Sequence, residues 1–151
     1  MKIPQEVIEL MKAEQIREFG PAAPLDEQYL DKLEKNAELI IHHFPHECAG
    51  FVLFYCNEPT KESSYITFIA TAQNARRKGV AFSLVTHVLN ISSRRGFKSC
   101  RLEVGKKNTG AISLYEKIGF VAVEDHGDKY LMSIDVRQPD VVDQNLKSML
   151  F

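Results

Sequence analysis

Three adjacent cations, Arg76, Arg77 and Lys78, stand directly before a glycine and an apolar helical pattern, in the stretch QNARRKGVAFSLV. The N-terminus of a helix already carries partial positive charge, so each exposed cation there costs about 0.3 to 1 kcal/mol. A negative ligand would reverse that cost, because the first N–H groups of a helix have no helical partner and bind phosphate readily. Gly79 and Ala81 keep the wall of this loop low, so that a phosphate could reach the amides. The stretch therefore predicts a phosphate site, with a solvated basic turn as the alternative.

The segment HHFPHEC, residues 42–48, contains other side chains that ligate metals. Pro45 rules out a helical pair of histidines four residues apart, and His42 and His43 point to opposite faces if the segment is a strand. A closed zinc site needs about four ligands, and the nearby Cys48 could join them only by a sharp fold of the chain. We therefore expect exposed turn residues here and no bound metal.

The composition limits the classes of protein that the chain can represent. Its 151 residues are 44% hydrophobic, which suits one domain, residues 1–151, with a core of its own. The formal net charge of −1 supplies no field that would attract nucleic acid or an anionic membrane to the whole surface. No apolar run approaches the length of a membrane span, and three cysteines without CxxC spacing favour reduced thiols. These features predict a cytoplasmic protein without a nucleic-acid or membrane partner.

The first half of the chain, which must position the cationic loop, predicts helices followed by strands. Apolar residues at helical spacing over 4–18 end at GPAAP, and Asp26 can cap a second helix, so residues 1–36 form a helical N-terminal part. The character then changes to short β-branched and aromatic runs, separated by polar stretches. We expect an antiparallel meander of strands at 37–41, 49–56 and 64–71.

The second half alternates between helical and strand patterns. Apolar residues recur at three- and four-residue steps from Val80, and KSCRLEV then alternates as a strand does. A strand, a helix and a strand in this order imply a parallel crossover. Asn108 can cap a further helix that Gly119 ends, and a final hairpin follows at 120–124 and 129–136. The fold class is mixed α/β, with a central, mostly antiparallel sheet, one parallel βαβ unit and flanking helices.

Two motifs in this half resemble the GNAT superfamily of acyl-CoA-dependent N-acyltransferases. RRKGVA, which follows SYITFIAT, is similar to the family's pyrophosphate loop, Q/R-x-x-G-x-G/A, and Arg76, Gly79 and Ala81 match it. RLEVGKKNTGAISLYEKIGF is similar to the family's later signature of a strand, an asparagine and a helix, which is matched by Leu102, Val104, Asn108, Leu114, Tyr115, Glu116, Lys117, Gly119 and Phe120. The resemblance covers roughly residues 64–136. Two motifs in the right order and spacing are more specific than either alone.

The resemblance implies a GNAT-like fold that binds acetyl-CoA as co-substrate. Strands at 66–72 and 99–104 would splay apart to admit the pantetheine arm. The backbone of Ile69, Ala70 and Thr71 would pair with that arm and orient the acyl carbonyl. The pyrophosphate would be held by the cationic loop and its amides, which the resemblance assigns to Arg76, Arg77, Lys78, Gly79, Val80 and Ala81.

The resemblance also implies roles for two residues of the later signature, one in binding and one in the reaction. Asn108 would contact the pantetheine arm besides capping its helix. Tyr115 would face the sulfur and act as general acid for the leaving thiolate, although a tyrosine on an apolar helix face is otherwise a core residue. A strand N–H near Ala70 or Thr71 would stabilise the oxyanion.

The reaction that we expect is transfer of an acetyl group to a primary amine by direct attack in a ternary complex. Many relatives carry a glutamate on the strand before the phosphate loop, but ITFIATA has no carboxylate. Deprotonating a lysine-like amine of pKa about 10.4 costs about 4.6 kcal/mol at pH 7, whereas an α-amine near 7.8 costs about 1. We therefore expect a small-molecule acceptor of lowered pKa, an amino sugar or an α-amine, with water carrying its proton. Substitute bases would be Glu103, Asp125, His126, His42, His43 or His46.

Other functions and both chain ends remain open at this point. A non-catalytic acyl-CoA-binding module, which would have no use for Tyr115, a protein N-acetyltransferase and O-acylation of a hydroxyl are the alternatives. The family usually begins with a strand, whereas residues 4–18 have a helical pattern, so that strand is lost, very short or supplied differently. Residues 137–151 form a candidate helical extension, which would cover the sheet edge or pack on a second subunit to give a homodimer.

Overall fold

The computed structural model describes residues 1–21, 25–45 and 47–137. All but the first residue of the predicted C-terminal extension, from 138 onward, lie outside these described residues. Within them, no helix is long and apolar enough to cross a membrane. The three cysteines are free thiols.

Two helices open the fold. Helix α1, Gln5–Phe19, ends at Gly20, whose φ of 86° lies in the region that favours glycine. Helix α2, Glu27–Asn36, begins after Asp26, and the Asp26 carboxylate accepts a 2.9 Å hydrogen bond from the Gln28 N–H. Both helices were predicted from the sequence, and no strand precedes α1 in the described residues.

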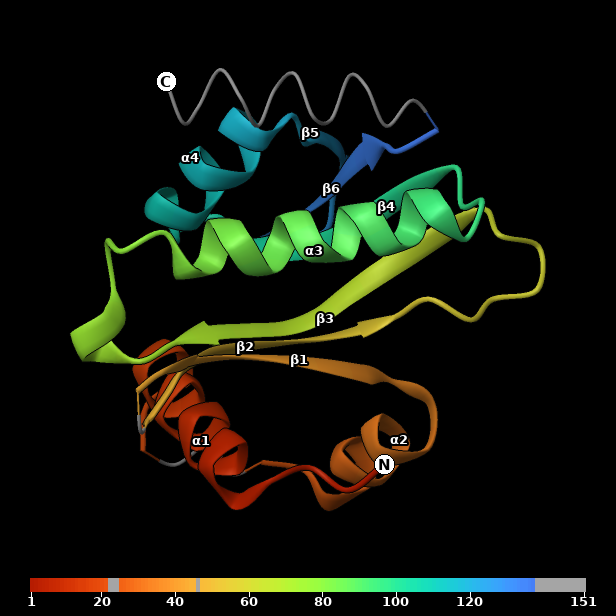
Figure 1. The fold of residues 1–151 in the computed structure, drawn as a ribbon. Coiled ribbons are helices and arrows are strands. Elements are labelled where there is room, and N and C mark those ends of the chain that lie inside the picture. The colour runs from red at the N-terminus through yellow and green to blue at the C-terminus, as the bar shows by residue number, and fades with distance from the viewer. Residues whose placement is uncertain (22–24, 46, 138–151) are drawn as a thin grey trace.

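A six-stranded sheet forms the centre of the fold, with the strands in the order β1-β2-β3-β4-β6-β5 (Figure 1). Its strands are β1 Glu38–Phe44, β2 Glu47–Tyr55, β3 Ser63–Thr71, β4 Ser99–Gly105, β5 Val121–Asp125 and β6 Lys129–Asp135. Every neighbouring pair is antiparallel except β3 and β4, which run parallel. The predicted meander, parallel unit and final hairpin are therefore confirmed.

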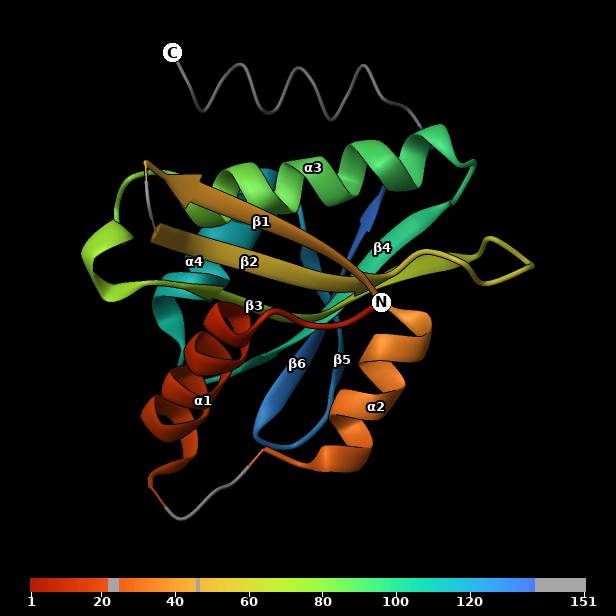
Figure 2. The ribbon, with the colours of Figure 1, turned by 60° about the horizontal axis from the view of Figure 1, so that its bottom comes forward.

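Helices cover both faces of the sheet (Figures 1 and 2). Helix α3, Val80–Arg94, and helix α4, Thr109–Ile118, pack on one face, where Leu84 and Ile118 belong to the larger apolar core. Helices α1 and α2 pack on the other face around Met11 in a second, smaller core. Because both faces are covered, β2 is buried along most of its length and its sequence is almost continuously apolar.

Strands β3 and β4 are paired along only part of their length. Four residue pairs join them, from Ser63 opposite Ser99 to Ile66 opposite Leu102. At the next residue, Thr67, a bulge interrupts the register between β3 and β2. Beyond it β3 continues on β2 alone, while β4 continues on β6. Because a bulge bends its strand, the predicted parting of the two strands begins here.

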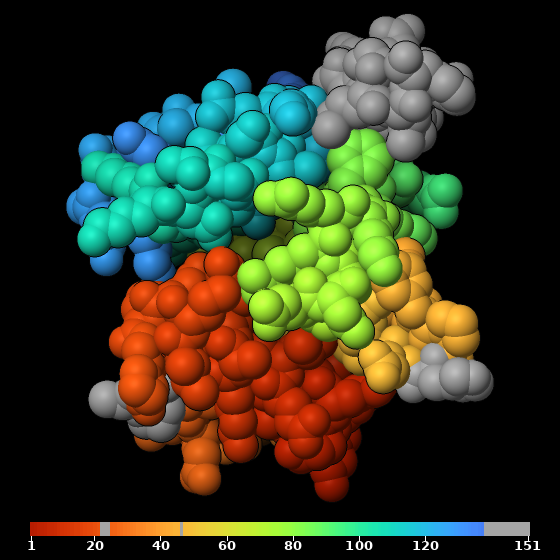
Figure 3. Space-filling model, turned by 90° about the vertical axis from the view of Figure 1, so that its left-hand side faces the viewer, coloured from red at the N-terminus to blue at the C-terminus, as the bar shows by residue number. Residues whose placement is uncertain are grey.

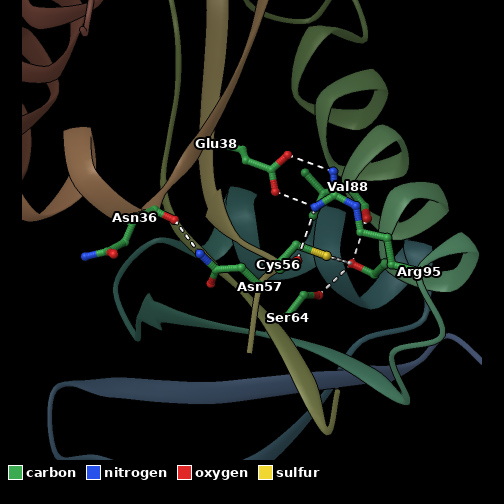
Figure 4. Close-up of polar contacts among 8 residues, drawn as sticks. Asn36, Glu38, Cys56, Asn57, Ser64, Val88 and Arg95 are labelled. Atoms are coloured by element: carbon green, nitrogen blue, oxygen red, sulfur yellow. Dashed lines mark hydrogen bonds and ion pairs between the residues drawn. The ribbon is translucent and has the colours of Figure 1, made fainter. Parts of the chain in front are cut away.

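The paired end of β3 and β4 is held by a buried polar network under α3 (Figure 4). The hydroxyl oxygens of Ser64 and Ser92 lie 2.6 Å apart, and both side chains are fully buried. Since Ser92 donates a 2.8 Å hydrogen bond to the Val88 carbonyl, Ser64 supplies the proton between the two hydroxyls. Just past the end of α3, Arg95 Nη2 lies 2.8 Å from Glu38 Oε1 of β1. These contacts fix the C-terminal part of α3 on the sheet.

Candidate active site

The gap between β3 and β4 opens into a cleft of about 800 Å³. Figure 3 shows its mouth as a hollow between α1 in red, the start of α3 in yellow-green and α4 in cyan. Because the cleft passes between two strands, side chains from both faces of the sheet reach it. Of the residues predicted for the site, the cleft is lined by Ile69, Ala70, Thr71, Arg76, Arg77, Gly79, Val80, Ala81, Asn108 and Tyr115. Lys78 is the exception.

The unpaired part of β3 presents backbone groups to this cleft. The Ala72 N–H donates a 2.8 Å hydrogen bond to the Ala49 carbonyl of β2. Polar groups of successive residues in a strand point to opposite edges, so those of Ala70 also face β2. The N–H and C=O groups of Ile69 and Thr71 therefore point away from β2, toward the position that β4 has left. An extended ligand could pair with β3 there as a neighbouring strand would.

The loop before α3 is shaped to bind an anion. Arg77 and Gly79 both have positive φ, 64° and 77°, a pattern that turns successive N–H groups inward. The first N–H of α3 with a helical partner is that of Ser83, which donates to the Gly79 carbonyl at 3.0 Å. The amides at 80–82 are thus free of helical bonds and lie at the positive end of the helix dipole.

Gly50 of β2 allows the start of α3 to lie close against the sheet. A Cβ at this position would be 2.8 Å from Val80 Cγ1 and 2.9 Å from the Ala70 carbonyl oxygen. Neither distance is sterically acceptable, so only glycine fits without a shift of the loop or of β3. The position of the free amides therefore depends on a residue outside the cleft.

The three cations of the loop take different positions. Arg76 and Arg77 line the cleft, and Arg76 Nη2 lies 3.9 Å from Glu14 Oε2 of α1. Lys78 instead lies over the ring of Phe44 at the end of β1, with Nζ 5.4 Å from the ring centroid. Nothing in the sequence distinguishes these three cations. In the fold, Arg76 and Arg77 line the cleft and Lys78 does not.

Tyr115 and Asn108 reach the cleft from the opposite wall. Asn108 is the predicted cap of α4, and its Oδ1 accepts a 3.3 Å hydrogen bond from the Ala111 N–H. Tyr115 is only 6% exposed and its ring packs edge-on against Phe120, with the centroids 5.8 Å apart. Burial, followed by the negative charges of Glu18 and Glu14, raises the pKa of Tyr115 well above its usual value. Tyr115 therefore keeps its proton at neutral pH.

On the α1/α2 face, tyrosines and a carboxylate line the cleft. The Tyr29 hydroxyl lies 2.7 Å from Thr67 Oγ1 and so ties α2 to the bulge of β3. The Tyr65 hydroxyl donates a 3.2 Å hydrogen bond to Glu103 Oε1. Glu103 Oε2 lies 3.2 Å from Nδ1 of His126, and this contact is the main cause that lowers the pKa of Glu103. Glu103 is thus a carboxylate that stays ionised.

Two carboxylates of α1 complete this side of the cleft, and sequence reasoning did not identify them. Glu14 is largely buried and accepts a 3.1 Å hydrogen bond from Arg17 Nε. Glu18 is exposed at the cleft mouth. Their spacing of four residues places both on one side of a helix, which was a usable signal. The apolar side of α1 predicts the helix, but nothing in the sequence shows that its polar side faces a cleft.

The other side chains considered as bases or metal ligands lie elsewhere. Asp125 Oδ1 pairs with Lys106 Nζ at 2.7 Å and, like His126, does not line the cleft. His43 Nε2 lies 3.2 Å from Glu6 Oε1, and the His42 ring stands edge-on to Phe44. His46 is outside the described residues. Within the part of the chain that the structure describes, no three His, Cys, Asp or Glu side chains are grouped as metal ligands would be.

Comparison with protein families gives one match over most of the chain. The model of the Acetyltransferase (GNAT) family matches residues 5–120. Among curated proteins, N-alpha-acetyltransferase 50 of Danio rerio is 26% identical over 147 residues, which are 96% of this chain and 86% of that protein.

Solved structures with the same fold include acetyltransferases, one of them with acetyl-CoA bound. A putative acetyltransferase of the GNAT family from Desulfovibrio desulfuricans superimposes with a TM-score of 0.72 at 17% identity, over 90% of this chain and 96% of that one. A GNAT family acetyltransferase from Elizabethkingia anophelis, whose structure contains acetyl-CoA, gives a TM-score of 0.64 at 19% identity, over 76% and 93%.

Proposed function

The chain belongs to the GNAT family of acetyl-CoA-dependent N-acetyltransferases, and from this premise we propose that it acetylates a primary amine of lowered pKa, foremost an α-amine. The observation that carries the proposal is the cleft between β3 and β4. On one side, the cleft is lined by the unpaired edge of β3, the cationic loop before α3 and the buried Tyr115. On the α1/α2 face of the sheet, it is lined by polar side chains that suit a second substrate.

The open edge of β3 and the loop before α3 fit the two polar parts of coenzyme A. Ile69 and Thr71 offer backbone groups in the pattern of a missing strand, which suits the amide-containing pantetheine arm. The amides at 80–82, with Arg76 and Arg77, suit the pyrophosphate. Acetyl-CoA bound in the structure from Elizabethkingia anophelis supports the same co-substrate for this fold.

The chemical roles follow from the direction of each group. The Thr71 N–H faces the cleft, whereas the Ala70 N–H is directed at β2, so Thr71 is the better donor to an oxyanion. Tyr115 retains its proton while the substrates bind, and in this proposal it gives that proton to the sulfur as the C–S bond breaks, which makes it the general acid. Asn108 stands at the same wall and positions the arm.

The acceptor amine enters from the α1/α2 face in this proposal. That side is lined by Tyr29, Tyr65 and Glu103, which offer hydroxyl groups and one ionised carboxylate. Such groups suit an amine that carries further polar atoms, as an amino acid, a peptide or an amino sugar does. The similarity to a protein named N-alpha-acetyltransferase 50 favours the α-amine among these, and it includes the N-terminus of a protein as acceptor.

An acceptor panel tests the proposal. Purified protein with acetyl-CoA is supplied with one of three acceptors: glucosamine, a lysine-free tripeptide with a free N-terminus, or an N-terminally blocked tripeptide that contains one lysine. The acetylated product is measured by mass spectrometry. We expect the free N-terminal peptide to react fastest and the lysine peptide slowest. Preference for lysine would contradict the acceptor class, and acetyl-CoA that neither binds nor reacts would contradict the function.

A further inference from the structure

Three carboxylates line the cleft, and they differ in what holds them. Glu14 is held by Arg17, and Glu103 is held by Tyr65 and His126. Glu18, in the last turn of α1, makes no ion pair and no side-chain hydrogen bond with any residue that the structure describes. A carboxylate that is not engaged by the protein is available to a substrate.

Glu18 lines the same cleft as the tyrosine that we propose as the general acid. Tyr115 comes from the α3/α4 face and Glu18 from the α1/α2 face, and both line the same cleft. Of the two carboxylates of α1, Glu18 contributes more than Glu14 to raising the pKa of Tyr115. The Tyr115 hydroxyl makes no hydrogen bond to any residue that the structure describes, and the Tyr115 side chain lines the cleft.

On this geometry, and resting on the proposed function, we propose that Glu18 is the general base that takes the proton from the acceptor amine. It would replace the strand glutamate that ITFIATA lacks. The acceptor, bound in its ammonium form, gives one N–H proton to the Glu18 carboxylate, and the lone pair freed on its nitrogen forms the C–N bond to the acetyl carbon. The C–S bond then breaks, and the sulfur takes the proton of Tyr115.

Two further proton transfers return Glu18 and Tyr115 to their starting states. The second proton of the attacking nitrogen passes to the Tyr115 phenolate and restores it. The proton on Glu18 leaves to solvent at the cleft mouth, where the side chain is exposed. One proton is thus released for each amide formed, as amide formation from an ammonium ion requires.

The charges around Glu18 suit this role. Desolvation at the cleft wall raises the pKa of Glu18, and repulsion from Glu14 raises it further, while Arg17 and Lys129 of β6 oppose the rise. Across the cleft, Tyr115 is neutral. Glu103 has the opposite shift, because His126 lowers its pKa. The pKa values of these two carboxylates are thus shifted in opposite directions. The raised pKa of Glu18 suits a base, and the lowered pKa of Glu103 suits a permanent negative charge.

The test compares Glu18→Gln with two matched variants. Glu9→Gln lies on the same helix but is exposed outside the cleft, and Glu103→Gln removes the rival carboxylate. With the best acceptor of the panel, we expect Glu18→Gln to lower kcat/KM by roughly a hundredfold or more, as loss of a general base does. Glu9→Gln should leave kcat/KM unchanged, and acetyl-CoA affinity and the thermal midpoint should persist in all three.

The pH profile separates a base from a structural residue. In the native chain kcat/KM should fall as the pH drops through the raised pKa of Glu18. In Glu18→Gln this dependence on Glu18 should be absent. There kcat/KM should instead rise with pH in proportion to the fraction of the acceptor amine that is deprotonated. Glu14→Gln should move the native limb to lower pH, because it removes the repulsion that raises the pKa.

Carbon NMR of the glutamate carboxyl groups supplies a readout that needs no acceptor. Glu18 should titrate above an ordinary glutamate and should shift downward in Glu14→Gln. An ordinary pKa, or a Glu18→Gln protein with native kcat/KM and pH profile, would overturn the proposal while leaving the acetyltransferase activity in place. A loss confined to Glu103→Gln would assign the base to Glu103 instead.

Discussion

The two ends of the β3–β4 interface behave in opposite ways. From Ser63 to Ile66 the strands are paired, and the buried hydroxyl pair of Ser64 and Ser92 joins them to α3. Beyond the bulge at Thr67 the same strands are apart, and the backbone of β3 faces the cleft. Buried backbone groups without partners are costly, so an open edge of this kind persists where a ligand can satisfy it. One end therefore holds the sheet together, and the other is the end at which we propose that acetyl-CoA binds.

The largest effect should come from the buried tyrosine of the open end. Tyr115→Phe removes the proton donor but keeps the ring against Phe120. We expect kcat to fall by roughly a hundredfold or more, with acetyl-CoA affinity nearly unchanged. The matched control is Tyr130→Phe, whose ring lies beside Lys106 and outside the cleft, and this variant should retain activity. Native turnover in Tyr115→Phe, measured at saturating acetyl-CoA, would show that the open end binds without this acid.

The cations of the anion loop should differ in their contribution to binding. Arg76 lines the cleft, whereas Lys78 lies over Phe44. A charge-assisted hydrogen bond contributes about 1.5 to 3 kcal/mol, so Arg76→Ala should weaken acetyl-CoA binding by roughly tenfold or more. Lys78→Ala should weaken it only about twofold, through long-range attraction. Calorimetric titration of the two variants measures this difference, and equal losses would contradict the placement of Lys78.

Gly50 links the paired sheet to the open end. The Cβ of Gly50→Ala would meet Val80 at 2.8 Å and the Ala70 carbonyl at 2.9 Å, so the start of α3 must shift. We expect a loss of about 1 to 3 kcal/mol in the free energy of unfolding and weaker acetyl-CoA binding. Gly127→Ala, in the β5–β6 turn at a φ of 87°, should lose stability without losing affinity. If both variants bind acetyl-CoA equally, the loop does not depend on Gly50.

The smallest effect on activity should come from the closed end. Ser92→Ala leaves the buried Ser64 hydroxyl without its 2.6 Å partner. The free energy of unfolding should fall by about 1 to 3 kcal/mol, while KM for acetyl-CoA stays at its native value. Chemical denaturation and steady-state kinetics on the same sample check both halves of this expectation. A raised KM with native stability would mean that the two ends are not separate.

Sequence patterns were sufficient for the elements that local residues decide. The apolar periodicity of α3, the Asn108 cap and the alternation in β4 place these elements close to their observed bounds. The loop before α3 and the free first turn of that helix were predictable because they are local features, and anion binding there stays a prediction. Each of these depends on a few residues that are adjacent in the chain.

The features that sequence reasoning missed depend on packing between distant segments. The bulge at Thr67 is a matter of register against β2, and Tyr29 reaches it from 38 residues away. Lys78 leaves the cleft because Phe44 of β1 lies within its reach. Glu18 enters the cleft because the smaller core holds α1 over the open end of the sheet. No short window of the sequence contains both partners of these contacts.

Amide hydrogen exchange, followed by NMR with and without acetyl-CoA, is the most direct test of the two ends of the β3–β4 interface. It asks whether the paired end stabilises the sheet while the open end binds the ligand. We predict that acetyl-CoA slows exchange at Ile69, Thr71 and the amides at 80–82, and leaves Ser63 to Ile66 as they were. Slowed exchange at the paired end with none at the open end, or no change at either, would contradict the account.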